Sequence, residues 1–282
     1  MNALEIKNLS KSYPGFQLDN VNLTLPCGCI MGLIGENGAG KSTTIKLILD
    51  MLHKDSGSIC ILGKDNQREL NLTKEDIGVV MDEVGIPEFL TAKQVGKVMK
   101  HTFRNWEQHT YEKYLSDFAV PMDKQFKDFS RGMKMKLGIA VALSHRAKLL
   151  ILDEATSGLD PVVRDEVVDL LSDFTRDESH SILISSHIVS DLEKLCDYVA
   201  FLHKGKLLLC EEKDLLLSEY GILHCTAQQL DRLDPDVIRY KKETPYGVEA
   251  MVLRSGVAPD MAVSPISIEE LFIFMVKEAK KK

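Results

Sequence analysis

The residues from Gly35 to Thr43 could bind phosphate, because they read G-E-N-G-A-G-K-S-T. In the pattern G-x-x-x-x-G-K-[ST], glycines let the backbone wrap closely, so that successive N–H groups point at one anion. Lys41 can then reach the β- and γ-phosphates, and the Ser42 hydroxyl can ligate Mg²⁺. An apolar, strand-like run at 29–34 precedes this stretch, and apolar residues at helical spacing follow it at 44–52. Strand, glycine loop and helix are the context that the motif needs, so the sequence predicts a nucleoside triphosphate site.

Two carboxylates, Asp153 and Glu154, end the apolar run at 149–152. An aspartate at the end of a strand beside a phosphate loop holds Mg²⁺, and the adjacent glutamate is placed to orient and deprotonate an attacking water. Taken alone, the pattern fits a strand followed by an acidic helix cap equally well. Its position downstream of a phosphate loop favours the catalytic interpretation.

Three further stretches, like the two carboxylates, come after the phosphate loop in a fixed order along the chain. The stretch Phe129–Met133 begins a predicted helix, and helix N-termini attract phosphate. The stretch Ser157–Asp160 follows the two carboxylates closely. His187 ends the next predicted strand, where it could contact a γ-phosphate. A lone histidine after a strand is usually structural, so its place in the order carries this interpretation.

The elements that must position these residues have an α/β pattern. Continuous apolar strands at 149–152, 182–184 and 199–202 alternate with helices at about 161–176 and 188–195. This alternation predicts a parallel sheet covered on both faces. The runs at 3–9 and 16–25 read as strands of a smaller sheet.

Helical periodicity replaces strands between about residues 82 and 145, which predicts a helical insertion in the α/β core. Thr91, Asn105 and Ser130 are the expected N-caps of its three helices. After residue 220 the alternation ends, and residues 221–282 are predicted to form a small α+β appendage with a final amphipathic helix at 268–277.

The composition excludes several classes of protein. The chain holds 35 basic and 42 acidic residues, with a formal net charge of −7, and its lysines and arginines are scattered. A nucleic acid partner is therefore not expected. No stretch approaches the roughly 18–20 apolar residues that span a bilayer, so the chain itself is expected to be soluble. The six cysteines form no zinc-binding pattern.

Together, these motifs resemble those of the ATP-binding cassette (ABC) ATPases from about residue 3 to residue 217. The resemblance implies a P-loop NTPase (RecA-like) core with an antiparallel β subdomain and the helical subdomain at about 82–145, within a domain of residues 1–220. It also implies a role for each matching residue. ATP would be bound by Asn37, Gly38, Gly40, Lys41, Ser42 and Thr43, with Tyr13 stacked on the adenine, and Mg²⁺ by Ser42 and Asp153. Catalysis would rest on Glu154 and His187. The signature Ser130, Arg131, Gly132 and Met133 would act on the ATP of a second cassette, and Asp160 would belong to the D-loop. A core tyrosine at a turn is the alternative for Tyr13.

The chain departs from the family pattern at two places. The family signature reads L-S-G-G-Q, and here Arg131 and Met133 replace a glycine and the glutamine. Similar substitutions are familiar from bacterial exporters of the ABC-2 type. After the strand-like run at 77–81, Asp82 stands where the family has a glutamine that senses magnesium. Because a carboxylate can ligate Mg²⁺ directly, Asp82 is predicted to replace that glutamine.

The function implied by the resemblance is ATP binding and hydrolysis in a membrane transporter. Two cassettes would close head to tail around two ATP molecules, so the chain must pair with itself or with a homologous ABC ATPase. The membrane-spanning permease subunits would be separate chains, which places this one peripherally on the cytoplasmic face of the membrane. The helix at 268–277 resembles those of multidrug, antibiotic and peptide exporters.

Two other classes of function remain open on the sequence alone. A soluble ABC ATPase of translation or DNA repair is one, although such proteins usually carry two cassettes or long coiled coils, which this chain lacks. A nucleotide kinase is the other, but it would leave the signature and the D-loop unexplained.

Overall fold

The fold is built on a central six-stranded sheet, seen in a computed structural model that describes residues 1–69, 74–259 and 261–280. The strand order is β10-β9-β3-β8-β7-β6. Strands β9, β3, β8, β7 and β6 run parallel, and β10 pairs antiparallel with β9 at the edge. The predicted parallel sheet is confirmed. Its strands are β3 (Ile30–Ile34), β6 (Ile77–Val80), β7 (Leu149–Asp153), β8 (Ser181–Ser186), β9 (Tyr198–His203) and β10 (Lys206–Glu212).

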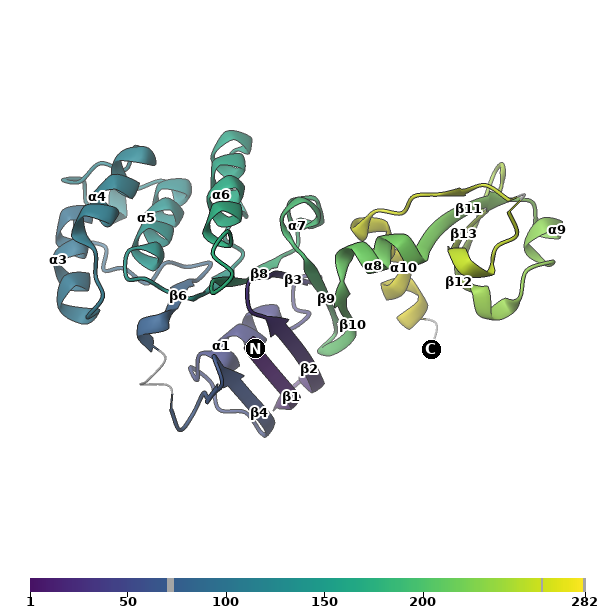
Figure 1. The fold of residues 1–282 in the computed structure, drawn as a ribbon, viewed down its shortest axis with the longest axis horizontal. Helices are drawn as coiled ribbons and strands as arrows, with labels where there is room; N and C mark the ends of the chain where they lie inside the picture. Colours follow the sequence, from purple (N-terminus) through teal and green to yellow (C-terminus); the bar gives the residue numbers. More distant parts are fainter. Residues whose placement is uncertain (70–73, 260, 281–282) are drawn as a thin grey trace.

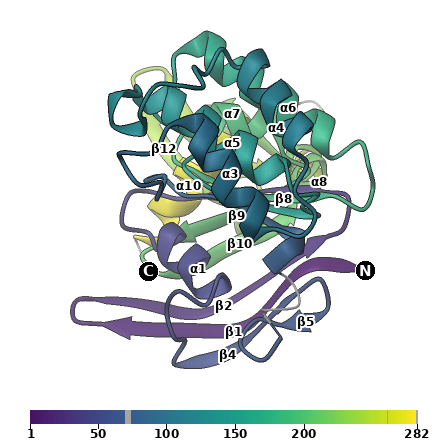
Figure 2. The same ribbon diagram turned by 90° about the vertical axis from the view of Figure 1, so that its left-hand side faces the viewer.

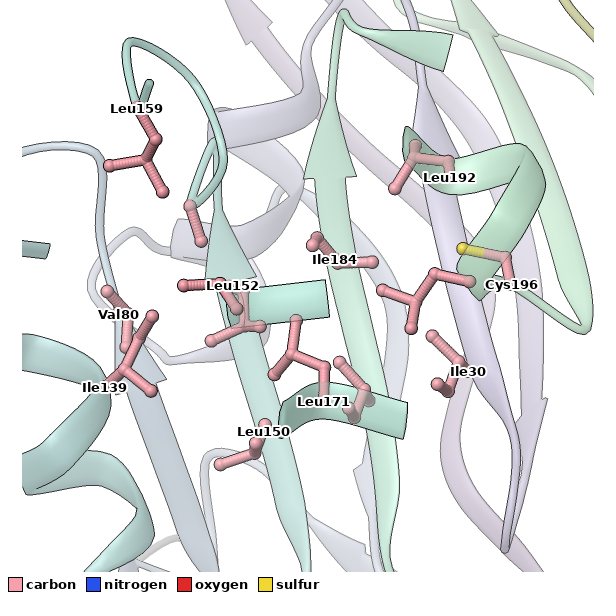
Figure 3. Packing of buried hydrophobic residues seen from close by; sticks show 14 of the residues in the cluster. Ile30, Val80, Ile139, Leu150, Leu152, Leu159, Leu171, Ile184, Leu192 and Cys196 are labelled. Carbon is pink, nitrogen blue, oxygen red and sulfur yellow. The ribbon is translucent and has the colours of Figure 1, made fainter. Parts of the chain in front are cut away.

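Helices cover one face of this sheet, and their apolar side chains meet those of alternate strand residues. Leu152 and Ile184 point to this face and pack with Leu171 of α6 and Leu192 of α7 (Figure 3). Neighbouring strand residues such as Leu183 belong to a separate cluster on the opposite face. The helices concerned are α5 (Arg131–Leu143), α6 (Pro161–Phe174) and α7 (Val189–Leu195).

The opposite face is covered by α1 (Lys41–Ile48) and a second, antiparallel sheet, which lies below the rest of the molecule in Figure 2. The order of this sheet is β2-β1-β4-β5. Its strands are β1 (Asn2–Tyr13), β2 (Phe16–Pro26), β4 (Ser56–Ile61) and β5 (Lys64–Asp65). The central sheet is therefore buried on both sides, which explains why its strands read as continuous apolar runs.

The helical insertion lies between β6 and β7 and comprises α3 (Ala92–Thr102), α4 (Gln108–Asp117) and α5. Thr91 and Ser130 cap α3 and α5 as predicted, but the N-cap of α4 is Glu107 and not Asn105. The Glu107 N–H donates to the Ser144 carbonyl at the end of α5, at 2.7 Å. This tertiary hydrogen bond delays the start of α4, and no local pattern could have shown it.

After α8 (Lys213–Glu219), the chain forms a third sheet with the order β12-β13-β11-β14. This sheet and the helical insertion lie at opposite ends of the molecule (Figure 1). The final helix, α10 (Ile268–Ala279), packs between the third sheet and the central sheet, with Phe272 edge-on against Phe201 of β9 and Phe274 stacked on Tyr240 of β12. The remaining elements are β11 (Tyr220–Cys225), α9 (Ala227–Leu230), β12 (Ile238–Thr244), β13 (Gly247–Leu253), β14 (Val263–Ser264) and short 3₁₀ turns at 74–76, 126–128, 235–237 and 254–256.

Candidate active site

A cavity of about 520 Å³ opens at the carboxyl ends of β3, β7 and β8. This edge of a parallel sheet is where α/β proteins usually bind ligands. The cavity brings together ten of the predicted site residues from five separate segments. They are Asn37, Gly38, Gly40, Lys41, Ser42, Thr43, Asp82, Arg131, Glu154 and His187. Glu36 and Ser157, from the predicted phosphate loop and the predicted Ser157–Asp160 stretch, also line the cavity, and Phe16 is the lining residue that the sequence had not indicated.

Two glycines shape the phosphate loop, because a side chain at either position would be strained or would clash. Gly40 has a φ of 112°, and a Cβ there would come within 2.9 Å of the Phe16 ring. A Cβ on Gly35 would lie 2.5 Å from the Leu202 carbonyl oxygen. Helix α1 begins at Lys41, directly after the loop. The first N–H groups of a helix have no partner within it, so the N-terminus of α1 can offer donors at the cavity, which is the arrangement that binds phosphate.

Glu154 lies at the centre of a charged cluster. Its Oε1 is 3.1 Å from Lys41 Nζ, and its Oε2 is 2.7 Å from His187 Nδ1. Burial by itself raises the pKa of Glu154, but the hydrogen bonds and charges of Lys41 and His187 outweigh it, so the pKa lies below the ordinary value. The carboxylate is thus ionised at neutral pH and able to accept a proton.

Asp153 lies behind the cavity and is 2% exposed. Its Oδ1 accepts a hydrogen bond of 2.6 Å from the Ser185 hydroxyl, which also accepts one from the Glu154 N–H. The described residues contain no group of three or more His, Cys, Asp or Glu side chains that could hold a metal by themselves. Mg²⁺ typically takes one or two protein oxygens and completes its shell with water and substrate phosphates. Asp153 and the Ser42 hydroxyl are oxygen donors of this kind, so the residues present fit the ion.

Asp82 and Arg131 are paired with each other at the rim of the cavity. Arg131 Nη2 donates to Asp82 Oδ1 at 2.6 Å, and both side chains are about half exposed. Asp82 was expected to meet a metal, and Arg131 was expected to face a second copy. In this structure each is the other's ion-pair partner.

The aromatic residue that lines the cavity is Phe16 and not Tyr13. The two are cross-strand partners at the β1–β2 turn, and Tyr13 is 38% exposed just outside the cavity. The sequence could have indicated Phe16 as a cavity residue, because it lies close to Tyr13 across the Pro14-Gly15 turn. The predicted stacking of Tyr13 on adenine remains a prediction.

Four further predicted residues, Ser130, Gly132, Met133 and Asp160, are not among those that line the cavity of their own chain. Ser130 caps α5 through the Met133 N–H, and Asp160 caps α6 through the Val162 and Val163 N–H groups. A Cβ on Gly132 would meet Leu159 alone, at 3.5 Å, so the backbone at this position is open to a close approach.

Residues 18–157 match the ABC transporter family, and the chain belongs to that family. A solved ATP-binding subunit of an ABC transporter matches with a TM-score of 0.69 and 28% identity, over 76% of this chain and 91% of that one. The chain is accordingly an ATP-binding and ATP-hydrolysing subunit of an ABC transporter, and the transporter interpretation is confirmed over translation, repair and kinase functions.

Relatives with more specific names show similarity over most of the chain. The lantibiotic transport ATP-binding protein SrtF of Streptococcus pyogenes is 41% identical, over 75% of this chain and 91% of the relative. The bacitracin transport ATP-binding protein BcrA of Enterococcus faecalis is 33% identical, over 73% and 68%. The uncharacterized ABC transporter ATP-binding protein YhcH of Bacillus subtilis aligns along 99% of this chain and 98% of its own length, with 29% identity. A cassette called MJ0796, dimeric with ADP and phosphate, shares the fold with a TM-score of 0.68 at 21% identity.

Proposed function

We propose that this ATPase drives the export of peptides, antibiotics or other drugs. The observation that supports the substrate class is the 41% identity to a lantibiotic transport protein over nearly the whole of that relative. The identity to a bacitracin transport protein supports the same class. The proposed direction of transport is export, because the substitutions Arg131 and Met133 in the signature resemble those of ABC-2-type exporters.

In the proposed reaction, the loop from Asn37 to Thr43 binds the triphosphate, and Lys41 leaves Glu154 to contact the β- and γ-phosphates. Water attacks the γ-phosphorus, the bond to the β–γ bridging oxygen breaks, and Glu154 accepts the proton of the water. His187 holds the carboxylate of Glu154 in place through its 2.7 Å contact. Mg²⁺, held by Ser42 and Asp153, would supply charge neutralisation at the phosphates.

The working unit in this proposal is a head-to-tail pair of cassettes. Ser130 and Asp160 do not line the cavity of their own chain, whereas the N-terminus of α5 is open at Gly132. A second copy, or a homologous ATPase, would bring its own α5 N-terminus to the phosphates across the interface. Two ATP molecules would then hold the pair together.

Glu154→Gln tests the reaction and the pairing together. The variant should bind ATP and barely hydrolyse it, so that ATP with Mg²⁺ shifts the purified protein from monomer to dimer in light scattering. Lys41→Ala is the control, because without the phosphate-binding lysine ATP should not produce the dimer. A Glu154→Gln variant that binds ATP and stays monomeric would contradict a homomeric pair, and one that hydrolyses ATP at the wild-type rate would contradict the role of Glu154.

A groove between α1, β6 and the helical insertion is the proposed contact with a membrane-spanning partner. No helix among the described residues is long and apolar enough to cross a bilayer. The groove measures about 750 Å³ and exposes Met51 and Val79, beside Met99 and Phe103. Exposed apolar patches on otherwise polar surfaces mark interaction sites. We assign this one to a permease subunit, which would hold the chain on the cytoplasmic face of the membrane.

Val79→Asp should release the chain from membranes of its source cells without altering nucleotide binding, because a charge at 79 would have to be buried on docking. Val98→Asp is the matched control, since Val98 is exposed on α3 but does not line the groove. Equal membrane association of the two variants, measured by fractionation, would refute this docking site.

A further inference from the structure

The two departures from the family pattern contact each other. Asp82 follows β6, and Arg131 is the first residue of α5, 49 positions further along the chain. The Arg131 guanidinium and the Asp82 carboxylate are 2.6 Å apart. Because the two unusual residues form one ion pair, we consider their roles together.

The ion pair is the common wall of two cavities. Asp82 and Arg131 line the nucleotide cavity and also a neighbouring cavity of about 560 Å³. Arg131 also covers Gly158, where a Cβ would come within 3.2 Å of its Cδ, Nε and Cζ atoms. The Arg131 side chain therefore joins the loop after β6 to the segment after β7.

The charges around the pair decide what either partner would do alone. The neighbouring cavity is lined by Glu83, Glu88 and Lys134, so its carboxylates outnumber its lysine. An unpaired Asp82 would add a negative charge at the rim of a site for a triphosphate, whereas an unpaired Arg131 would add a positive one. Pairing cancels both charges.

We propose that Arg131 is a positioning residue that acts through Asp82. Its guanidinium holds the loop after β6 against α5 and keeps the Asp82 carboxylate away from the phosphates. The proposal rests on the proposed function only in taking the 520 Å³ cavity as the ATP site.

Equilibrium ATP binding by wild type, Asp82→Ala, Arg131→Ala and the double variant tests this assignment. Arg131→Ala should weaken ATP binding about two- to fivefold, the range of an exposed ion pair, because it exposes the Asp82 carboxylate to the phosphates. In the Asp82→Ala background the same change should have no effect, since no carboxylate is left to restrain. Arg131→Lys should retain part of the wild-type affinity, and Lys134→Ala is a control for loss of a positive charge on the same helix.

A loss of affinity that is equal in both backgrounds would overturn the proposal, since Arg131 would then act on the nucleotide directly. Hydrogen exchange of the amides at 83–86, measured without nucleotide, gives an independent result. Exchange should be faster in both single variants, and wild-type rates in both would also overturn the proposal. If the wild-type chain failed to bind ATP, the proposed function would fail, and the exchange rates would still decide whether the ion pair holds the loop.

Discussion

Glu154 adopts a backbone conformation that is rare for residues other than glycine, with a φ of 53°. Its N–H donates to the Ser185 hydroxyl and to the Ser185 carbonyl oxygen, each at 3.1 Å. Its carboxylate is held by Lys41 and His187. Strained residues persist where the surroundings fix them from several sides, and they concentrate at functional sites.

The charge of Glu154 predicts how stability depends on pH. Its folded pKa is lowered, so its stabilising contribution is complete above the unfolded pKa of about 4.3 and is lost as the pH falls through the folded value. The free energy of unfolding of the wild type should therefore fall more steeply in acid than that of Glu154→Gln. Urea titrations between about pH 7 and 3 measure this difference, and parallel curves for the two proteins would contradict it.

At the scale of elements, β6 depends on a glycine for its packing. A Cβ on Gly78 would lie 2.5 Å from a Leu150 methyl group and 2.8 Å from the Ala142 carbonyl oxygen. Strand β6 therefore approaches both β7 and α5 more closely than any side chain permits. Because Asp82 follows this strand, the same close packing sets its position.

Gly78→Ala should lower the free energy of unfolding by about 1–3 kcal/mol, the usual effect of overpacking. Gly85→Ala is the control, because a Cβ there meets nothing within 4 Å, and it should change stability by less than about 0.5 kcal/mol. Urea unfolding of the two variants compares them directly, and similar values for both would show that β6 can move aside.

The sequence predicted the elements whose signals are local, and it missed features that depend on distant contacts. Thr91 and Ser130 are caps because the side chain and the N–H that it accepts from are three residues apart. The start of α4 depends instead on Ser144, and the Asp82–Arg131 pair joins residues 49 apart. A phosphate loop can be recognised in a sequence because its signal is local: its binding groups are consecutive in the chain.

At the scale of the whole molecule, α10 joins the C-terminal sheet to the ATPase core. The ring centroids of Phe272 and Phe201 are 5.3 Å apart. The Ile268 N–H donates to Glu193 of α7 at 3.4 Å, and Lys280, just past the helix, lies 3.7 Å from Glu36 in the phosphate loop. The last helix of the chain thus reaches both the buried core and the rim of the cavity.

Phe272→Ala should therefore destabilise the whole chain, by about 3–5 kcal/mol, and not the C-terminal sheet alone. Its neighbour Ile273 is 39% exposed, and Ile273→Ala should have an effect below about 0.5 kcal/mol. Thermal unfolding monitored separately at the core and at the C-terminal sheet would test this. A Phe272→Ala variant whose core melts at the wild-type temperature would show that α10 does not support the core.

The ion pair between Lys41 and Glu154 should affect which anions the site binds. Lys41 Nζ already donates to the Gly35 carbonyl at 2.7 Å and lies 3.1 Å from Glu154, so its charge is satisfied within the protein. An incoming ligand must compete with this internal carboxylate before it gains the lysine. A triphosphate offers several charges and contacts in return, whereas a single inorganic phosphate offers few. We therefore expect the pair to disfavour small anions such as inorganic phosphate relative to a nucleoside triphosphate.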